Sequence, residues 1–236
     1  MSAKKVNRKT KPSSSQNAEK HSVVYFGSQS ANPFHLLSNF AIIKPEEGTI
    51  FFRGFHFNSA EHAYQSLKFP QDKIYLLSVD GPYSKFTCFV DEGHHGDVLF
   101  ANLSPEKKVL KMKYWEKKGN IGIIAKMISA PDVMEKLGIV PVPIQYSDDI
   151  WLDILRQKFQ IPRFRQILKP SEPLKNKQAN VFINNLYRGT ETLIEFSKSA
   201  KSSDSFFGAC VDSEDGKIYG NNYMGKMLMK IRDEIF

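Results

Sequence analysis

The sequence predicts an α+β fold, a mostly helical single domain built around a small sheet. Short runs of β-branched and aromatic residues, typical of strands, stand far apart in the chain at 23–26, 51–57 and 192–196. Longer segments between and after them carry apolar residues at helical spacing behind capping residues. With 236 residues, 41% of them hydrophobic, the chain can bury one substantial core.

Positive charge is concentrated at the start of the chain. The formal net charge is +8, and residues 1–20 hold six basic side chains and one acidic one. Because residues 1–21 contain almost nothing to bury, we expect a disordered basic tail ahead of a domain at 22–236. Such a tail can contact nucleic acid or act as a targeting signal, and it can also do neither.

Membrane and secretion signals are missing from the sequence. No apolar run reaches the length of a membrane span, and the start lacks the apolar core of a signal peptide. Cys88 and Cys210 have no metal-type spacing, which suits free thiols in a reducing compartment. We therefore expect a cytoplasmic protein without a membrane partner or a cofactor.

The first predicted strand, residues 23–26, ends at Gly27. The loop that follows is rich in Asn, Pro and Ser, as turns are, and runs to Ser38 and Asn39. Asn39 could offer its amide to a ligand, or it could close an Asx-turn on its own backbone.

The chain is organised around residues 54–69. The aromatic run at 51–57 predicts a buried strand, after which Ser59 is a suitable helix N-cap. Glu61 falls in the first turn, where the helix dipole favours an ionised carboxylate. Glu61, Gln65 and Lys68 share one helix face. This polar stripe is either part of a site or the solvated face of an ordinary amphipathic helix.

The middle of the chain contains one segment with metal-binding residue types. Residues 91–97 hold two histidines and three carboxylates. Adjacent histidines point in different directions, and the spacing matches no common zinc pattern. A solvated loop is the better interpretation, and we expect no metal.

Further helices are predicted on either side of a turn at Pro131. Ser104 and Pro105 are typical of a helix start. The apolar side of that helix is expected to consist of Val109, Leu110, Met112 and Trp115. A later helix, capped by residues 148–149, has a core stripe of Trp151, Ile154, Leu155 and Phe159.

The last helix is predicted to begin at Asn222 as N-cap. Its core residues are Met224, Met227, Leu228, Ile231 and Ile235. Gly220, Asn222 and Gly225 could leave backbone N–H groups open for a phosphate at the positive end of the helix dipole. The alternative is a plain capped helix.

Several segments occur in a fixed order over residues 25–236: Tyr25–Gly27, Leu37–Phe40, Gly54–Phe69, Leu193–Glu195, Asp204–Gly208 and Gly220–Arg232. Together they resemble the signature of the YbiA-like family, also called NADAR, whose members are N-glycosidases and ADP-ribose-related hydrolases. The sequence departs from the pattern at Phe207, where the family has tryptophan, and around Trp115, which is followed by an apparent insertion.

The resemblance implies a YbiA-like fold and a hydrolase of N-glycosyl bonds. The substrates would be phosphoribosylamino-pyrimidine intermediates of riboflavin biosynthesis, split to ribose 5-phosphate and the aminopyrimidine. Glu61 and Asp204 would be the catalytic carboxylates, because bond cleavage leaves positive charge on the sugar. Glu195 is a third candidate, although a strand carboxylate can simply pair with Lys68 or Arg232.

Binding of such a substrate requires a grip on the phosphate and a surface for the base. Lys68, Arg232 and the N–H groups near Gly225 are candidates for the phosphate. Phe40, Trp115 and Phe207 are candidates for stacking, with core packing as the alternative for each. The expected substrate-binding residues are Asn39, Phe40, Lys68, Glu195, Phe207, Gly208, Asn222, Gly225 and Arg232.

Two other functions stay open. The same fold could remove ADP-ribose from nucleobases or cleave an NAD-derived metabolite. Alternatively, the chain could be a binding module that senses ADP-ribose-like ligands or nucleic acid without turnover. Glu61 and Asp204 favour the enzyme, and the basic tail favours the binding module.

Overall fold

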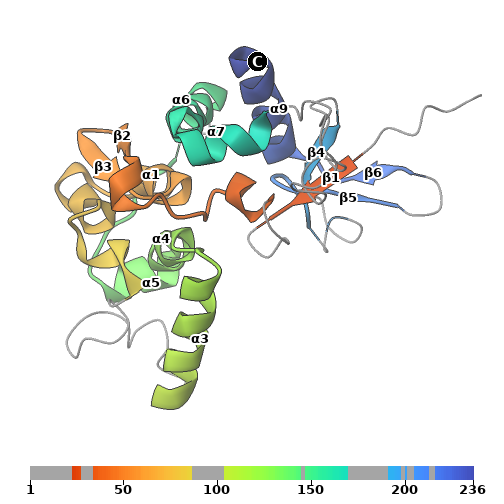
Figure 1. Cartoon of the computed structure of the whole chain (residues 1–236). Coiled ribbons are helices and arrows are strands. Elements are labelled where there is room, and N and C mark those ends of the chain that lie inside the picture. The colour runs from red at the N-terminus through yellow and green to blue at the C-terminus, as the bar shows by residue number, and fades with distance from the viewer. Residues whose placement is uncertain are drawn as a thin grey trace, which may run out of the picture.

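The computed structural model in Figure 1 describes residues 23–27, 34–86, 104–144, 147–169, 191–197, 200, 205–212 and 216–236. The predicted tail, the loop at 91–97, Cys88 and Asp204 lie outside these residues. Cys210 is a free, buried thiol. Within the described part of the chain, no helix is long and apolar enough to cross a membrane.

The described residues combine many helices with few, short strands, which confirms the α+β prediction. Strand β1 (Val23–Phe26) pairs in parallel with β4 (Thr192–Glu195), as Figure 1 shows. A bridge between Phe196 and Ala209 leads to β5 (Cys210–Val211), which pairs antiparallel with β6 (Ile218–Tyr219). Two distant segments of the chain therefore meet at β1 and β4.

The aromatic run at 51–57 forms a hairpin, so the prediction of a single strand was wrong. Strands β2 (Ile50–Phe52) and β3 (Phe55–Phe57) pair antiparallel. Arg53 and Gly54 turn the chain with φ of 50° and 85°, the left-handed backbone of a tight hairpin turn. On the free edge, Gln157 bonds both backbone groups of Phe51, at 2.8 Å and 3.1 Å.

Helices make up most of the remaining structure. The α-helices are α1 (Ala60–Gln65), α3 (Pro105–Lys117), α4 (Gly122–Ile128), α5 (Pro131–Lys136), α6 (Asp148–Gln160), α7 (Pro162–Leu168) and α9 (Tyr223–Ile235). The 3₁₀ turns are η1 (Phe34–Leu37), η2 (Pro45–Glu47), η3 (Ser66–Lys68), η4 (Gln71–Leu77) and η5 (Pro82–Ser84).

Two predicted details of the helices need correction. Pro131 begins α5 rather than only marking a turn, because proline suits the first position of a helix. Helix α6 is capped by Ser147, whose Oγ accepts the N–H of Asp149 at 3.2 Å, and not by the two aspartates. The predicted core stripe of α6 is buried along its length.

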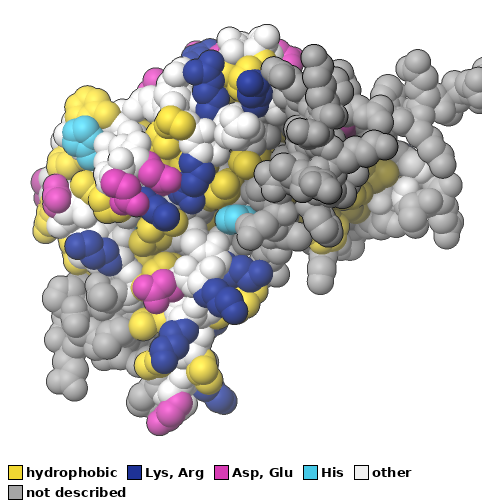
Figure 2. All heavy atoms as spheres, in the orientation of Figure 1, with side chains coloured by type: hydrophobic (Ala, Val, Ile, Leu, Met, Phe, Trp, Pro, Cys, Tyr) yellow, Lys and Arg dark blue, Asp and Glu magenta, His cyan; other side chains and the backbone are white. Residues whose placement is uncertain are grey.

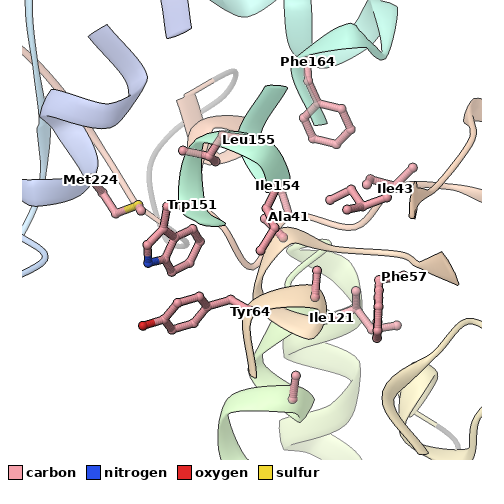
Figure 3. Close-up of a cluster of buried hydrophobic side chains, with 14 of the residues drawn as sticks. Ala41, Ile43, Phe57, Tyr64, Ile121, Trp151, Ile154, Leu155, Phe164 and Met224 are labelled. Carbon is pink, nitrogen blue, oxygen red and sulfur yellow. The ribbon is translucent and has the colours of Figure 1, made fainter. Parts of the chain in front are cut away.

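The core surrounds α1, and every residue of this helix is buried. Figure 3 shows Tyr64 of α1 facing Trp151 of α6, with Met224 of α9 nearby. The solvated-helix interpretation of the stripe at Glu61 is therefore wrong. A short helix whose polar groups are enclosed must find partners for them inside the protein.

Helix α3 is the exception to this burial. Of its predicted apolar side, Trp115 is buried and Met112 partly so, whereas Val109 and Leu110 are 39% and 67% exposed. In Figure 1 this helix projects from the lower end of the molecule. Its attachment depends on Trp115 and Met112, and most of its surface faces solvent.

Candidate functional site

A cavity of about 390 Å³ lies where α1, α4 and α6 meet strand β4. It is lined by Ser38, Asn39, Phe40, Glu61, Tyr64, Gln65, Lys68, Lys126, Ala130, Trp151, Glu195 and Phe207. Six residues expected to act on a substrate are in this lining: Asn39, Phe40, Glu61, Lys68, Glu195 and Phe207. Segments far apart in the sequence thus converge on one hollow.

The start of α1 is fixed by a pair of buried side chains. Ser59 Oγ accepts the N–H of His62 at 3.1 Å, so the predicted cap is confirmed. The ring of His62 bridges Ser59 Oγ at 2.8 Å and the carbonyl of Tyr83 at 2.9 Å. Because a carbonyl only accepts, Nε2 carries the proton and Nδ1 accepts from Ser59. Burial lowers the pKa of His62 to about 4, which keeps the ring neutral.

Glu61 is placed by its backbone and by a close helix contact. Its N–H donates to the carbonyl of Asn39 at 3.0 Å, while Gly122 donates to the carbonyl of Phe40 at 3.1 Å. A Cβ at position 122 would lie 2.6 Å from Cα of Phe40 and 2.9 Å from Cβ of Glu61. Glycine at this position therefore allows α4 to approach α1 and the loop at residues 38–40.

A chain of hydrogen bonds reaches the Glu61 carboxylate. Ser129 Oγ donates to Gln65 Oε1 at 2.6 Å, and Gln65 Nε2 donates to Glu61 Oε1 at 2.7 Å. The predicted shared face of Glu61 and Gln65 is confirmed. Lys68 continues it in η3, with Nζ 3.4 Å from the carbonyl of Ser129. The amide of Gln65 is thereby oriented with its donor toward the carboxylate.

Burial, and not the helix dipole, dominates the titration of Glu61. Burial raises the pKa of Glu61, opposed by the hydrogen bond from Gln65 and by the charges of Lys126 and Lys68. A six-residue helix offers a dipole contribution of only about 0.3–1 kcal/mol, less than the desolvation of a carboxylate. The predicted effect of the helix dipole is therefore outweighed by burial, and the factors that favour the ionised carboxylate are the amide of Gln65 and the two lysines.

Glu195 titrates near neutrality. Burial and the nearby charge of Glu61 raise the pKa of Glu195 to about 7, while Lys126 and Lys158 oppose the shift. Burial also lowers the pKa of Lys68, although Glu61 acts in the opposite sense. The protonation of Glu195 and that of Lys68 are thus each coupled to the charge of Glu61.

Aromatic rings form one wall of the cavity. Tyr64 and Trp151 stack at 3.9 Å between ring centroids with an angle of 21°, and Phe207 meets Trp151 edge-on at 6.3 Å. Trp151 was predicted only as a core residue, and it is 2% exposed. Lys126 Nζ lies 5.5 Å from the centre of the Phe40 ring, and both residues belong to the lining.

A buried lysine supports the loop at residues 38–40 from behind. Lys158 has no exposed surface, and its Nζ donates to the carbonyl of Ser38 at 2.7 Å and to that of Leu37 at 3.4 Å. Burial and the charge of Arg163 lower the pKa of Lys158 to about 7, with Glu195 opposing them. This ammonium group holds the backbone that presents Asn39 and Phe40.

The start of α9 contributes no residue to the cavity lining. The N–H groups of Tyr223 and Met224 donate to the carbonyls of Phe206 and Phe207, each at 3.2 Å. Asn222 has a left-handed φ of 48° and makes no cap bond. Its side chain donates to the carbonyl of Leu193 at 2.9 Å and accepts the N–H of Glu195 at 3.2 Å. The predicted side-chain cap was wrong, and the N–H groups of Tyr223 and Met224 are not open for a phosphate.

The remaining candidates from the sequence have structural positions. A Cβ at Gly225 would collide with the carbonyl oxygen of Leu193, and one at Gly208 would lie 2.8 Å from that of Glu195. Arg232 donates to the carbonyl of Glu191 at 2.9 Å, so it anchors α9 instead of reaching the cavity. Trp115 belongs to α3 and is not in the lining either.

Other lining residues were not named as catalytic or substrate-binding candidates, although Gln65 belongs to the polar stripe at Glu61: Ser38, Tyr64, Gln65, Lys126, Ala130 and Trp151. Tyr64 and Gln65 do occur in the family-like segment at 54–69. Lys126 carries no local signal, because an exposed lysine on a helix is common. Asp204 lies outside the described residues, so its role stays a prediction.

The fold and the cavity can be compared with known proteins. No protein-family model, no curated protein and no solved structure matches the chain. The chemistry of the cavity is therefore the basis for assigning a function. Its carboxyl groups can exchange protons, its amines can neutralise an anion, and its rings can cover a flat ligand.

Proposed function

We propose that this chain is a hydrolase of N-glycosidic bonds with a YbiA-like fold, related to the NADAR N-glycosidases that its sequence resembles. The observation that carries the proposal is the convergence of Glu61 and Glu195 on a cavity walled by aromatic rings and bordered by two lysines. Each group has a task in the cleavage of a bond between a sugar and a base.

The carboxyl groups would divide the proton transfers between them. Glu61 receives a hydrogen bond from Gln65 and lies in the field of Lys126 and Lys68, which makes it the better-stabilised anion of the pair. Glu195, with a pKa of about 7, is suited to hold a proton near neutral pH. Two close carboxyl groups commonly share one proton in this manner.

The reaction then balances with water as the only co-reactant. The carbon–nitrogen bond breaks, its electron pair stays on the departing nitrogen, and Glu195 supplies the proton. The carboxylate of Glu61 faces the positive charge that develops on the anomeric carbon. It accepts a proton from the water whose oxygen bonds to that carbon. Proton exchange between the carboxyl groups or with solvent restores the starting state.

Substrate size and charge follow from the same lining. Lys68 and Lys126 would bind a phosphate, and the wall of Tyr64, Trp151 and Phe207 would flank a flat base. A cavity of about 390 Å³ is at the lower end of the range for small-molecule sites. This favours a phosphoribosylamino-pyrimidine, with one phosphate, over an ADP-ribosyl compound.

The proposal is tested by incubating the purified chain with a phosphoribosylamino-pyrimidine, an ADP-ribosylated nucleobase and NAD in parallel. We expect ribose 5-phosphate and the free aminopyrimidine from the first compound only. Release from the ADP-ribosylated base or NAD alone would make the ADP-ribose-related hydrolase the better assignment. Saturable binding without any release would contradict the enzyme and support a binding module.

A further inference from the structure

The exposed helix α3 has an unusual charge. Residues 105–118, which are α3 and its C-cap Lys118, hold six lysines and two glutamates, a net charge of +4. Residues 21–236 as a whole carry only +3. The entire positive excess of the chain beyond its first 20 residues is therefore located on this one helix. Figure 2 shows lysine or arginine side chains along it, interspersed with hydrophobic ones.

The lysines are arranged in a stripe with an aromatic ring. Lys107, Lys111, Tyr114 and Lys118 follow one another at intervals of four, three and four residues, which places them on one face of the helix. The stripe extends over about 16 Å, from a rise of about 1.5 Å per residue. Lys111 Nζ also lies 5.4 Å from the ring centre of Trp115, which is buried.

Most of the stripe is exposed, and Lys118 at its end is half-buried. Lys107 and Lys111 are exposed, and the ring of Tyr114 is 45% exposed. Leu110 beside them is 67% exposed. An exposed tyrosine and leucine between cations resemble the surfaces on which unpaired bases stack while lysines contact the phosphates.

We propose that the α3 stripe binds single-stranded nucleic acid. Charge complementarity determines the class of partner, since consecutive phosphates match a row of lysines. A lipid surface is the poorer match, because a membrane-binding helix needs a broad apolar face and the exposed apolar groups of α3 are few. The inference does not depend on the proposed hydrolase function.

The test is an anisotropy titration of a labelled single-stranded 15-mer with the full chain at several salt concentrations. One triple variant carries Lys107→Gln, Lys111→Gln and Lys118→Gln. The matched control carries Lys44→Gln, Lys136→Gln and Lys230→Gln, which remove the same charge from exposed positions on other elements. Both retain the basic tail, and Gln is nearly as good a helix former as Lys.

We expect the triple variant of α3 to bind at least about tenfold more weakly than the unaltered chain. The slope of the logarithm of the binding constant against the logarithm of the salt concentration should become smaller in magnitude by about 2. The control triple should change affinity less than about twofold, the scale of surface charge changes distant from a binding site. Tyr114→Ala should weaken binding by about fivefold, and Tyr114→Phe should not, because stacking needs only the ring. A triple of Lys→Arg at 107, 111 and 118 should retain the affinity.

Equal losses in the two triples would overturn the proposal, since the net charge or the tail would then account for binding. Equally tight binding of a duplex together with an inert Tyr114→Ala would contradict the single-strand assignment. Stronger binding to phosphatidylserine vesicles, lost in the α3 triple, would assign the helix to a lipid surface instead. Thermal melts of each variant, compared with the unaltered chain, establish that a loss of binding is not a loss of folding.

Discussion

Helices α1 and α9 both begin behind a polar residue that follows a short strand, and the sequence indicated a ligand site at each start. At α1, Ser59 caps the helix, and the carboxyl group of Glu61 lines the cavity. At α9, Asn222 is bonded to β4, and the next two N–H groups are bonded to the preceding loop. At both starts two backbone N–H groups are bonded within the protein, those of Glu61 and His62 and those of Tyr223 and Met224, so what distinguishes α1 is the side chain it presents.

This difference follows from what packs against each start. Gly122 lets α4 close over the backbone at α1 while the Glu61 side chain remains at the hollow. Gly225 lets β4 lie directly on α9, which leaves no room for a ligand. A glycine at a helix start therefore indicates close approach, and only the structure tells whether a ligand or another segment makes that approach.

The largest expected change in stability comes from a substitution at the start of α9, where β4 packs directly on the helix. Gly225→Ala should destabilise the protein by about 3 kcal/mol, because the new methyl group collides with the carbonyl of Leu193 and forces β4 away. Thermal and denaturant melts measure this change. Lys226→Ala, at the exposed neighbouring position, is the control and should change stability by less than about 0.5 kcal/mol. Equal melts for both variants would contradict the close packing.

Asn222→Ala should cost about 2 kcal/mol, since it removes both side-chain bonds to β4 and places alanine at a left-handed φ. Asn222→Gly loses the same bonds but adopts the left-handed φ without strain. Its melting temperature should therefore lie between that of the unaltered chain and that of Asn222→Ala. If Asn222→Ala melted normally but bound ribose 5-phosphate weakly, the phosphate site would belong to α9 after all.

The lysine that lines the cavity beyond α1 and the lysine in the first turn of α9 should affect substrate binding differently. Lys68→Gln should raise the KM for a phosphoribosyl substrate about tenfold, the value of one charge-assisted hydrogen bond of about 1.5 kcal/mol. Lys226→Gln, in the first turn of α9, should leave KM unchanged because the lysine is outside the cavity lining. Steady-state kinetics of the two variants measure both KM values. A larger rise in KM for Lys226→Gln than for Lys68→Gln would place the phosphate at α9 instead of the cavity.

The smallest effect is a change in pH profile. A raised pKa means that Glu195 is protonated below about pH 7 and loses its proton above it, so kcat/KM should fall as pH rises through about 7. The pKa of Lys158 is also about 7, so variants are needed to assign this fall of kcat/KM, the alkaline limb, to one of the two residues. Lys158→Arg should preserve the limb, and Glu195→Gln should give a slower enzyme without it. The opposite pattern would assign the limb to Lys158.

Local sequence patterns predicted the helices and strands better than the contacts between these elements. The cap at Ser59, the shared face of Glu61 and Gln65, and the core stripe of α6 all follow from helical spacing and short-range hydrogen bonds. The hairpin at 51–57 was missed because its turn uses Arg53 in a left-handed conformation, which few non-glycine residues adopt.

What could not be predicted depends on contacts between distant segments. Lys126 reaches the cavity only because α4 packs on α1, and the raised pKa of Glu195 comes from its burial and from Glu61 lying nearby. The same limit explains α3, where helical spacing indicated a buried apolar side but only Trp115 and Met112 find something to pack against. Periodicity predicts a helix and one preferred face, and it carries no information about what covers that face.

The most direct test of the proposed site is the kcat of Glu61→Gln for ribose 5-phosphate release, with a thermal melt of the same protein. Gln retains the shape of the side chain and removes the charge that would face the cationic transition state, so turnover should fall by about 10²–10³ or more. Glu135→Gln, an exposed carboxylate on α5, is the matched control and should turn over normally. A reduced kcat with a normal melt is the predicted result, and an unchanged kcat would contradict the assignment of Glu61 to catalysis.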